Sequence, residues 1–142
     1  MRGTMRVLAR LSGVAAATLI VAFGGSAVEA QVPGGMITVD DRGQFLPAGQ
    51  AMISGTYSCE EDSGFAFITG NLVQPVGRLT PVRGEFITEA VCTGETETWT
   101  ALVQGAGNYR GGRAVASVSL MVCPDATCVS VAETTEDVRL TR

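Results

Sequence analysis

The sequence predicts an all-β fold, either an antiparallel sandwich or a barrel. After residue 30 the apolar segments are short and rich in Val, Ile, Thr and Phe, residue types that favour strands. Turn-forming residues recur about every ten positions, a spacing typical of small β-domains. No window sustains the helical repeat of apolar residues, so we expect strands throughout.

The N-terminal residues have the pattern of a secretory signal peptide. Arg2, Arg6 and Arg10 give a basic start, and an apolar run follows at Val14–Phe23. Small residues then lead to a Val-x-Ala pattern that predicts cleavage after Ala30. A membrane anchor is the alternative, but the run is shorter than the roughly 18–20 residues that a spanning helix needs. Cleavage would leave residues 31–142 as one domain.

The charge of residues 31–142 excludes several functions. Seven arginines face thirteen acidic residues, and the chain has neither lysine nor histidine. An acidic domain of this kind is not expected to bind nucleic acid, and we expect contact with a membrane only during export. Without histidine no Ser-His-Asp or Cys-His arrangement can form, so we predict that the protein is not an enzyme and needs no cofactor.

Turn residues delimit the strands expected in the first half of the domain. The turn at 40–43 separates a strand at 36–39 from a short edge piece at 44–46. In the next strand, 51–59, the odd-numbered residues share one face, and serines and threonines occupy the other. A polar connector then leads to an apolar strand at 65–73, which we expect to be interrupted at Gly70–Asn71.

The second half continues in the same way. A loop at 75–84 is expected to contain a short piece at 78–80, and the strand 85–93 follows with Phe86 on its apolar face. The strand 113–123 alternates most clearly, with its even-numbered residues apolar. The other expected segments are the strand 97–104, the glycine-rich loop 105–112, and the final strands 128–132 and 137–141.

Four cysteines in a short exported chain predict two disulfides. Cys59 and Cys92 each end an apolar strand face, so both should point inward. Cys123 and Cys128 bracket a turn-like segment, 124–127. Of the three possible pairings we therefore favour Cys59–Cys92 with Cys123–Cys128. Buried free thiols and a zinc site are the alternatives, although a zinc site without histidine is a weak pattern.

Six motifs resemble a group of short exported actinobacterial proteins with an immunoglobulin-like domain of unknown function. They are Gly-Thr-Tyr-x-Cys at 55–59, Val-Cys-Thr-Gly at 91–94, Thr-Trp-Thr at 98–100, Gly-Gly-Arg-Ala-Val-Ala at 111–116, Cys-x4-Cys at 123–128 and Val-Arg-Leu at 138–140. The resemblance covers about Met36 to Arg142. It implies an immunoglobulin-like antiparallel β-sandwich of about seven to nine strands and export, and it implies no activity.

Two further resemblances cover less of the chain. The late Cys-x4-Cys is similar to the hairpin of the neocarzinostatin-type apoproteins, which implies a carrier of small apolar ligands. The four-cysteine plan and the triplet Val122-Cys123-Pro124 are similar to the exported subtilisin-inhibitor family, which implies an inhibitor that presents residues 124–127. Both functions stand as alternatives to an interaction module.

Few residues are candidates for a site. Trp99 lies on an alternating face and is expected to pack in the core against the Cys59–Cys92 bridge, with a sugar-stacking platform as the alternative. Residues 60–62 are expected to form a solvated acidic bend and not a calcium site. Tyr109 and Arg110, in the glycine-rich loop, are the candidates for binding a partner.

We therefore predict a secreted, disulfide-stabilised β-sandwich that acts as a binding or cell-envelope interaction module. The expected partner is an unidentified protein or envelope component, and the expected state is a monomer.

Overall fold

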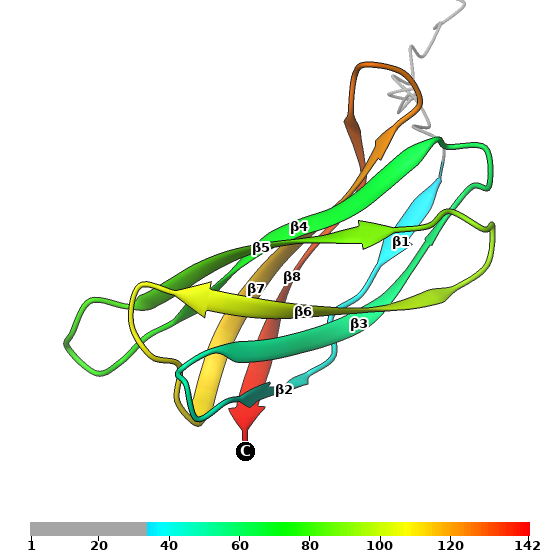
Figure 1. Ribbon diagram of the computed structural model, residues 1–142. Helices are drawn as coiled ribbons and strands as arrows, with labels where there is room; N and C mark the ends of the chain where they lie inside the picture. Colours follow the sequence, from blue (N-terminus) through cyan, green and yellow to red (C-terminus); the bar gives the residue numbers. More distant parts are fainter. Residues whose placement is uncertain (1–33) are drawn as a thin grey trace, which may run out of the picture.

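The computed structural model describes residues 34–142, so the predicted signal peptide, 1–30, lies outside the described residues. Eight strands make up the described part, and it contains no helix (Figure 1). It accordingly has no helix that could cross a membrane. The strands are β1 (Gly35–Ile37), β2 (Arg42–Phe45), β3 (Ala51–Cys59), β4 (Phe65–Gln74), β5 (Val82–Ala90), β6 (Glu97–Gly105), β7 (Gly112–Cys123) and β8 (Val129–Thr141).

Seven of these strands close into a β-barrel, so the prediction of an open immunoglobulin-like sandwich is wrong. The strands are hydrogen-bonded in the order β3-β2-β8-β7-β4-β5-β6, and β6 pairs again with β3. The short strand β1 lies beside β3 and pairs with it alone. The barrel is also not purely antiparallel, because β2 and β8 run parallel.

The two ladders that close the barrel are short, which explains why the strand patterns did not distinguish a barrel from a sandwich. β2 and β8 share three residue pairs, and β5 and β6 share two, Gly84–Gly105 and Glu85–Gln104. A Cβ atom at Gly84 would lie 2.5 Å from the Gln104 carbonyl and 2.7 Å from the Tyr109 hydroxyl. Glycine at position 84 therefore lets β5 and β6 approach each other. The alternation of apolar residues in the sequence does not predict such a contact.

The interior is filled by the side chains that the alternation placed inward. The odd-numbered residues of β3 and the even-numbered residues of β7 from 114 to 122 are all buried. Phe86, Ala90 and Cys92 are buried as predicted, and Glu85 and Glu89 point to solvent. The face predictions for these strands are confirmed.

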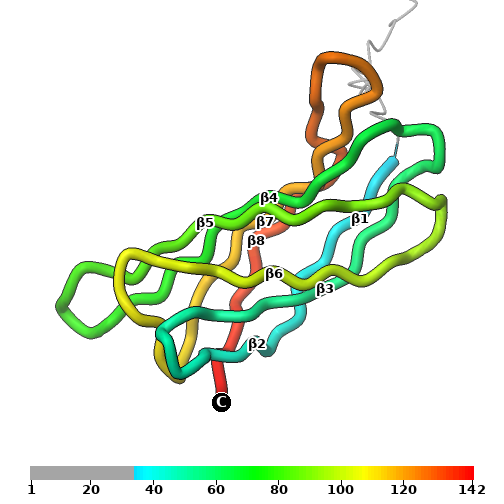
Figure 2. The backbone as a smooth tube through the Cα atoms, in the orientation of Figure 1, coloured from blue at the N-terminus to red at the C-terminus, as the bar shows by residue number. Residues whose placement is uncertain are grey.

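Several element boundaries differ from the prediction. β4 continues through Gly70 and Asn71, and residues 78–80 form a turn and not a strand. The two final segments are one strand, β8, which pairs with β7 along most of its length with one irregularity near Met121. The turn between β7 and β8 projects from one end of the barrel, drawn in orange, and the C-terminus lies at the other end (Figure 2).

Candidate functional site

The four cysteines form two disulfides, with the same partners that the sequence favoured. Cys59–Cys92 ties the end of β3 to the segment after β5, and both of its cysteines are buried. Cys123–Cys128 closes the exposed turn between β7 and β8. Residues 34–142 contain no free cysteine, so no thiol of the described part is available as a nucleophile or metal ligand.

Tyr109 does not lie at the surface, so the prediction that it contacts a partner is wrong. Its side chain is 2% exposed, and its hydroxyl donates a hydrogen bond to the Leu72 carbonyl at 2.7 Å. Burial raises the pKa of Tyr109 above the ordinary value of 10.0, and a backbone hydrogen bond from Gly84 partly opposes that shift. Tyr109 therefore anchors the glycine-rich loop to β4.

Arg110 is exposed, but its backbone is held from inside the barrel wall. The buried amide of Gln74 donates to the Arg110 carbonyl at 2.8 Å and accepts from the Arg110 N–H at 2.9 Å. Both hydrogen-bonding groups of the amide are thus satisfied by one residue of the loop. Together with the tyrosine anchor, this clamp makes the loop between β6 and β7 part of the scaffold.

Trp99 lies in the core, as predicted, and is not a sugar-stacking platform. It is 3% exposed, and its indole N–H donates to the Thr38 carbonyl at 3.0 Å. Its ring stacks on Phe86, with centroids 5.8 Å apart and planes inclined by 12°. The stack joins β6 to β5 across the barrel wall, at a level where those two strands are not hydrogen-bonded.

The acidic bend and the bridged turn are both exposed. Residues 60–62 lie in the turn between β3 and β4, and within residues 34–142 no group of three acidic, cysteine or histidine side chains is arranged to hold a metal ion. In the bridged turn, the Thr127 N–H donates to the Asp125 carboxylate at 2.7 Å. Nothing in this local geometry favours the protease-inhibitor hypothesis over the others.

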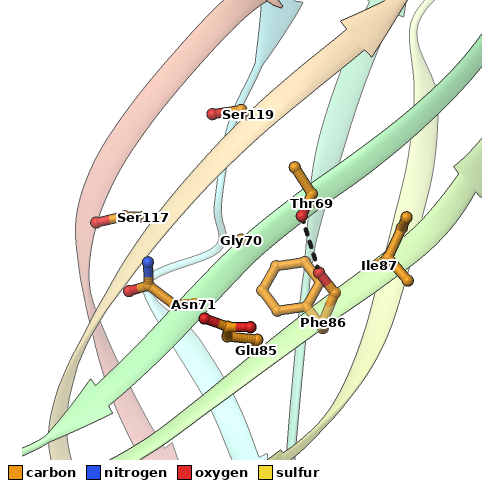
Figure 3. Close-up of a pocket in the computed structure, with 8 residues that line it drawn as sticks. All are labelled: Thr69, Gly70, Asn71, Glu85, Phe86, Ile87, Ser117 and Ser119. Atoms are coloured by element: carbon orange, nitrogen blue, oxygen red, sulfur yellow. Dashed lines mark hydrogen bonds between the residues drawn. The ribbon is translucent and has the colours of Figure 1, made fainter.

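A hollow of about 530 Å³ lies on the outer face of β7, β4 and β5 (Figure 3). The strand registers place its outward side chains in two rows of three. One row is Ser117–Asn71–Glu85 and the other is Ser119–Thr69–Ile87. We call the surface formed by these six residues the outer groove. Five of the six carry hydroxyl, amide or carboxylate groups, and Ile87 is the one apolar side chain.

Most polar groups of the outer groove are free to bind a ligand. The Thr69 hydroxyl donates to the Phe86 carbonyl at 3.3 Å, and Ser117 bonds to Thr135 of β8 at 3.3 Å. Within residues 34–142 the side chains of Asn71, Glu85 and Ser119 make no such bond to protein groups. Figure 3 shows the side chains of Asn71 and Glu85 next to each other. The groove thus presents an amide, a carboxylate and a hydroxyl to solvent.

An aromatic pair continues the same outer face toward the bridged turn. Phe65 and Phe67 precede Thr69 at alternate positions of β4, and their ring centroids are 5.9 Å apart. Phe65 is 59% exposed, although it lies within a strand. The face therefore combines exposed aromatic surface with a patch of free polar groups.

Sequence reasoning missed the outer groove. The signal that was available is the polar alternation at Ser117 and Ser119 on β7 and at Thr69 and Asn71 on β4. Alternation shows that such residues point outward, but it does not show which strands are neighbours. The groove appears only when β4 is placed between β5 and β7.

These features define a small, disulfide-linked β-barrel with a polar groove on its outer wall. The chain belongs to the family of unknown function DUF6299, whose model matches residues 33–141. No curated protein matches the chain in a sequence comparison.

Proposed function

We propose that this protein is an exported binding module of the cell envelope that recognises hydroxyl-rich ligands, such as polysaccharide, in the outer groove. The observation that carries the proposal is the set of side chains there that make no hydrogen bond within residues 34–142, those of Asn71, Glu85 and Ser119. Free polar groups on adjacent strands can each donate to or accept from a sugar hydroxyl. Strands also hold such groups more rigidly than loops do.

The neighbouring aromatic pair supports the same ligand class. Sugar rings carry apolar C–H faces as well as hydroxyls, and the rings of Phe67 and Phe65 lie two and four residues before Thr69 of the groove. We propose binding and not catalysis. The chain contains no histidine, and Glu85 is the one carboxylate among the residues that line the hollow.

Co-sedimentation with insoluble cell-wall polysaccharide tests this function. The wild-type protein should sediment with the polymer, and the variants Asn71→Ala and Glu85→Gln should remain in solution. Glu61→Gln is the matched control, because Glu61 is an exposed carboxylate in the turn between β3 and β4 and does not line the hollow. If the wild type stays in solution, or if all four proteins sediment equally, the groove is not a polysaccharide site.

We further propose that residues 1–30 direct export and are removed, and that the barrel works outside the cell as a monomer. The two disulfides support this compartment, because such bonds persist in oxidising surroundings. The partner is then an envelope component and not a nucleic acid. Mass spectrometry of protein from the culture medium should give a chain that begins at Gln31 with four oxidised cysteines. An intact N-terminus on the mature protein would contradict the export proposal.

A second candidate function is carriage of a small apolar ligand. A hollow of about 440 Å³ lies beside the glycine-rich loop and is lined in part by Phe45, Leu46 and Pro47. It is an external site, because the barrel interior is filled by side chains. A hydrophobic fluorescent dye should bind the wild type and lose affinity for Phe45→Ala, and equal binding by both proteins would exclude this site.

A further inference from the structure

The wall of the barrel has an opening in its backbone ladder between β5 and β6. The two strands share two residue pairs, whereas β4 and β5 share nine and β3 and β6 share seven. Beyond the Glu85–Gln104 pair the strands diverge (Figure 1). We call the unpaired stretch, 86–90 of β5 and 97–103 of β6, the seam.

Hydrogen bonds at both ends of the seam show which backbone groups face it. The Tyr57 hydroxyl accepts from the Val91 N–H at 3.0 Å and donates to the Val91 carbonyl at 3.2 Å, so both groups point away from β4. At the other end the Arg83 carbonyl accepts from the Ala106 N–H at 3.1 Å. In an antiparallel strand both groups of every second residue point to the same side. The groups of Ile87 and Glu89 therefore face the seam.

The same alternation applies to β6. Gln104 pairs with Glu85, so the backbone groups of Leu102 and Thr100 also face β5. Within residues 34–142 these groups have no strand partner on the seam side. Beneath them the stacked rings of Phe86 and Trp99 close the interior. The seam is thus a pair of free strand edges above a solid aromatic floor.

The side chains beside the seam are apolar, acidic or neutral polar, and none of them is basic. Ile87 is 70% exposed and Leu102 is 47% exposed, although both lie in strands. Residues 86–90 and 97–103 contain two glutamates, Glu89 and Glu97, and no arginine. On β5 the outward residues are Arg83, Glu85, Ile87 and Glu89; Ile87 and Glu89 lie in the seam, and Glu85 lies at its end. A complementary strand would carry an apolar side chain opposite Ile87 and basic side chains opposite Glu89 and toward Glu85.

We propose that the seam binds an extended peptide segment of a partner protein, which adds as a strand to the free edge of β5. Its backbone would pair with Ile87 and Glu89, and its alternate side chains would be apolar opposite Ile87 and basic opposite Glu89. Strand addition takes its affinity from main-chain hydrogen bonds and its specificity from alternate side chains. The site is distinct from the outer groove, because it uses the backbone edge of β5 and a peptide ligand.

The probe is an acetylated, amidated heptapeptide of sequence TKTVTKT, titrated into isotope-labelled protein. We expect saturable shifts in the amide resonances of Ile87, Glu89, Thr100 and Leu102. N-methylation of the central peptide residues whose N–H groups face β5 should abolish binding. N-methylation of the peptide residues whose N–H groups point away from β5 should weaken binding less. Ile87→Pro should weaken binding by roughly tenfold or more, because it removes one main-chain donor.

Two measurements separate loss of binding from loss of fold. Ile87 has no ladder pair with β6 among residues 34–142, so Ile87→Pro should keep the cooperative unfolding transition of the wild type. Leu79→Lys is the control, since Leu79 is 72% exposed in the turn between β4 and β5 and touches no free strand edge. Equal effects of the two N-methylation patterns, shifts confined to other strands, or no shift at millimolar peptide would each overturn the proposal.

Discussion

Removal of the Cys59–Cys92 disulfide should destabilise the barrel more than removal of Cys123–Cys128. A disulfide limits the conformational freedom of the unfolded chain, and the effect grows with the number of residues in the closed loop. The first bridge spans 33 positions and the second spans 5. The loop-entropy relation then predicts losses of about 3.7 and about 2 kcal/mol in the free energy of unfolding at 25 °C.

The first loss is large for a domain of this size, because small domains are stable by only about 5–15 kcal/mol in total. Both sulfurs of Cys59–Cys92 are also buried, so alanine substitution removes some core packing in addition. Cys123 and Cys128 lie at the projecting turn, where little packing is lost.

Urea unfolding of the variants Cys59→Ala/Cys92→Ala and Cys123→Ala/Cys128→Ala measures both losses. With a slope of about 1–3 kcal/mol per molar urea, the first pair should lower the midpoint by roughly 1–4 M and the second by about half as much. Equal losses, or a larger loss for the short bridge, would refute loop closure as the origin of the stabilisation.

Three smaller effects follow from single contacts. Tyr109→Phe should lower the free energy of unfolding by about 1–2 kcal/mol. Because its pKa is raised on folding, Tyr109 contributes stability that is complete below pH 10.0 and is lost as the pH rises through the folded-state value, so the phenylalanine variant should show less alkaline destabilisation in pH-dependent melts. Gly70→Ala would place a Cβ against the Ser117 carbonyl and 2.8 Å from the Phe86 ring, and should cost about 1–3 kcal/mol in urea unfolding; Phe86→Leu should restore only the part due to the ring. Arg113→Met breaks the ion pair between Arg113 and Asp137, whose side chains are 74% and 58% exposed. It should change the free energy of unfolding by less than about 1 kcal/mol.

The parts of the fold that depend on local pattern were predictable. Period-two alternation identified the inward faces of β3 and β7, and it placed Trp99 in the core. The residue pattern was compatible with either a sandwich or a barrel. The resemblance to immunoglobulin-like domains then favoured the sandwich. What decides between them is a few residue pairs at Gly84 and at β2, and short contacts between distant strands leave no periodic signal.

The candidate site was less predictable because it depends on registers. Tyr109 looked like a loop-tip residue, since glycines surround it in the sequence. Its burial depends on β4 and β5, which supply the Leu72 carbonyl and the Gly84 contact from distant positions. Likewise, the outer groove joins residues from three strands, and a shift of one residue in either register would disperse its two rows.

The way in which the barrel closes explains why its two candidate binding surfaces both involve β5. On its β4 side this strand has a complete ladder, which fixes the groove residues Glu85 and Ile87 in register with Asn71 and Thr69. On its β6 side the ladder has two residue pairs, and beyond them the Phe86–Trp99 stack connects β5 to β6. Tyr57 of β3 holds the chain just after β5 through its hydrogen bonds to Val91. Side-chain closure seals the core and leaves main-chain groups of the edge unpaired. One strand can therefore serve a rigid polar face and an open edge at the same time.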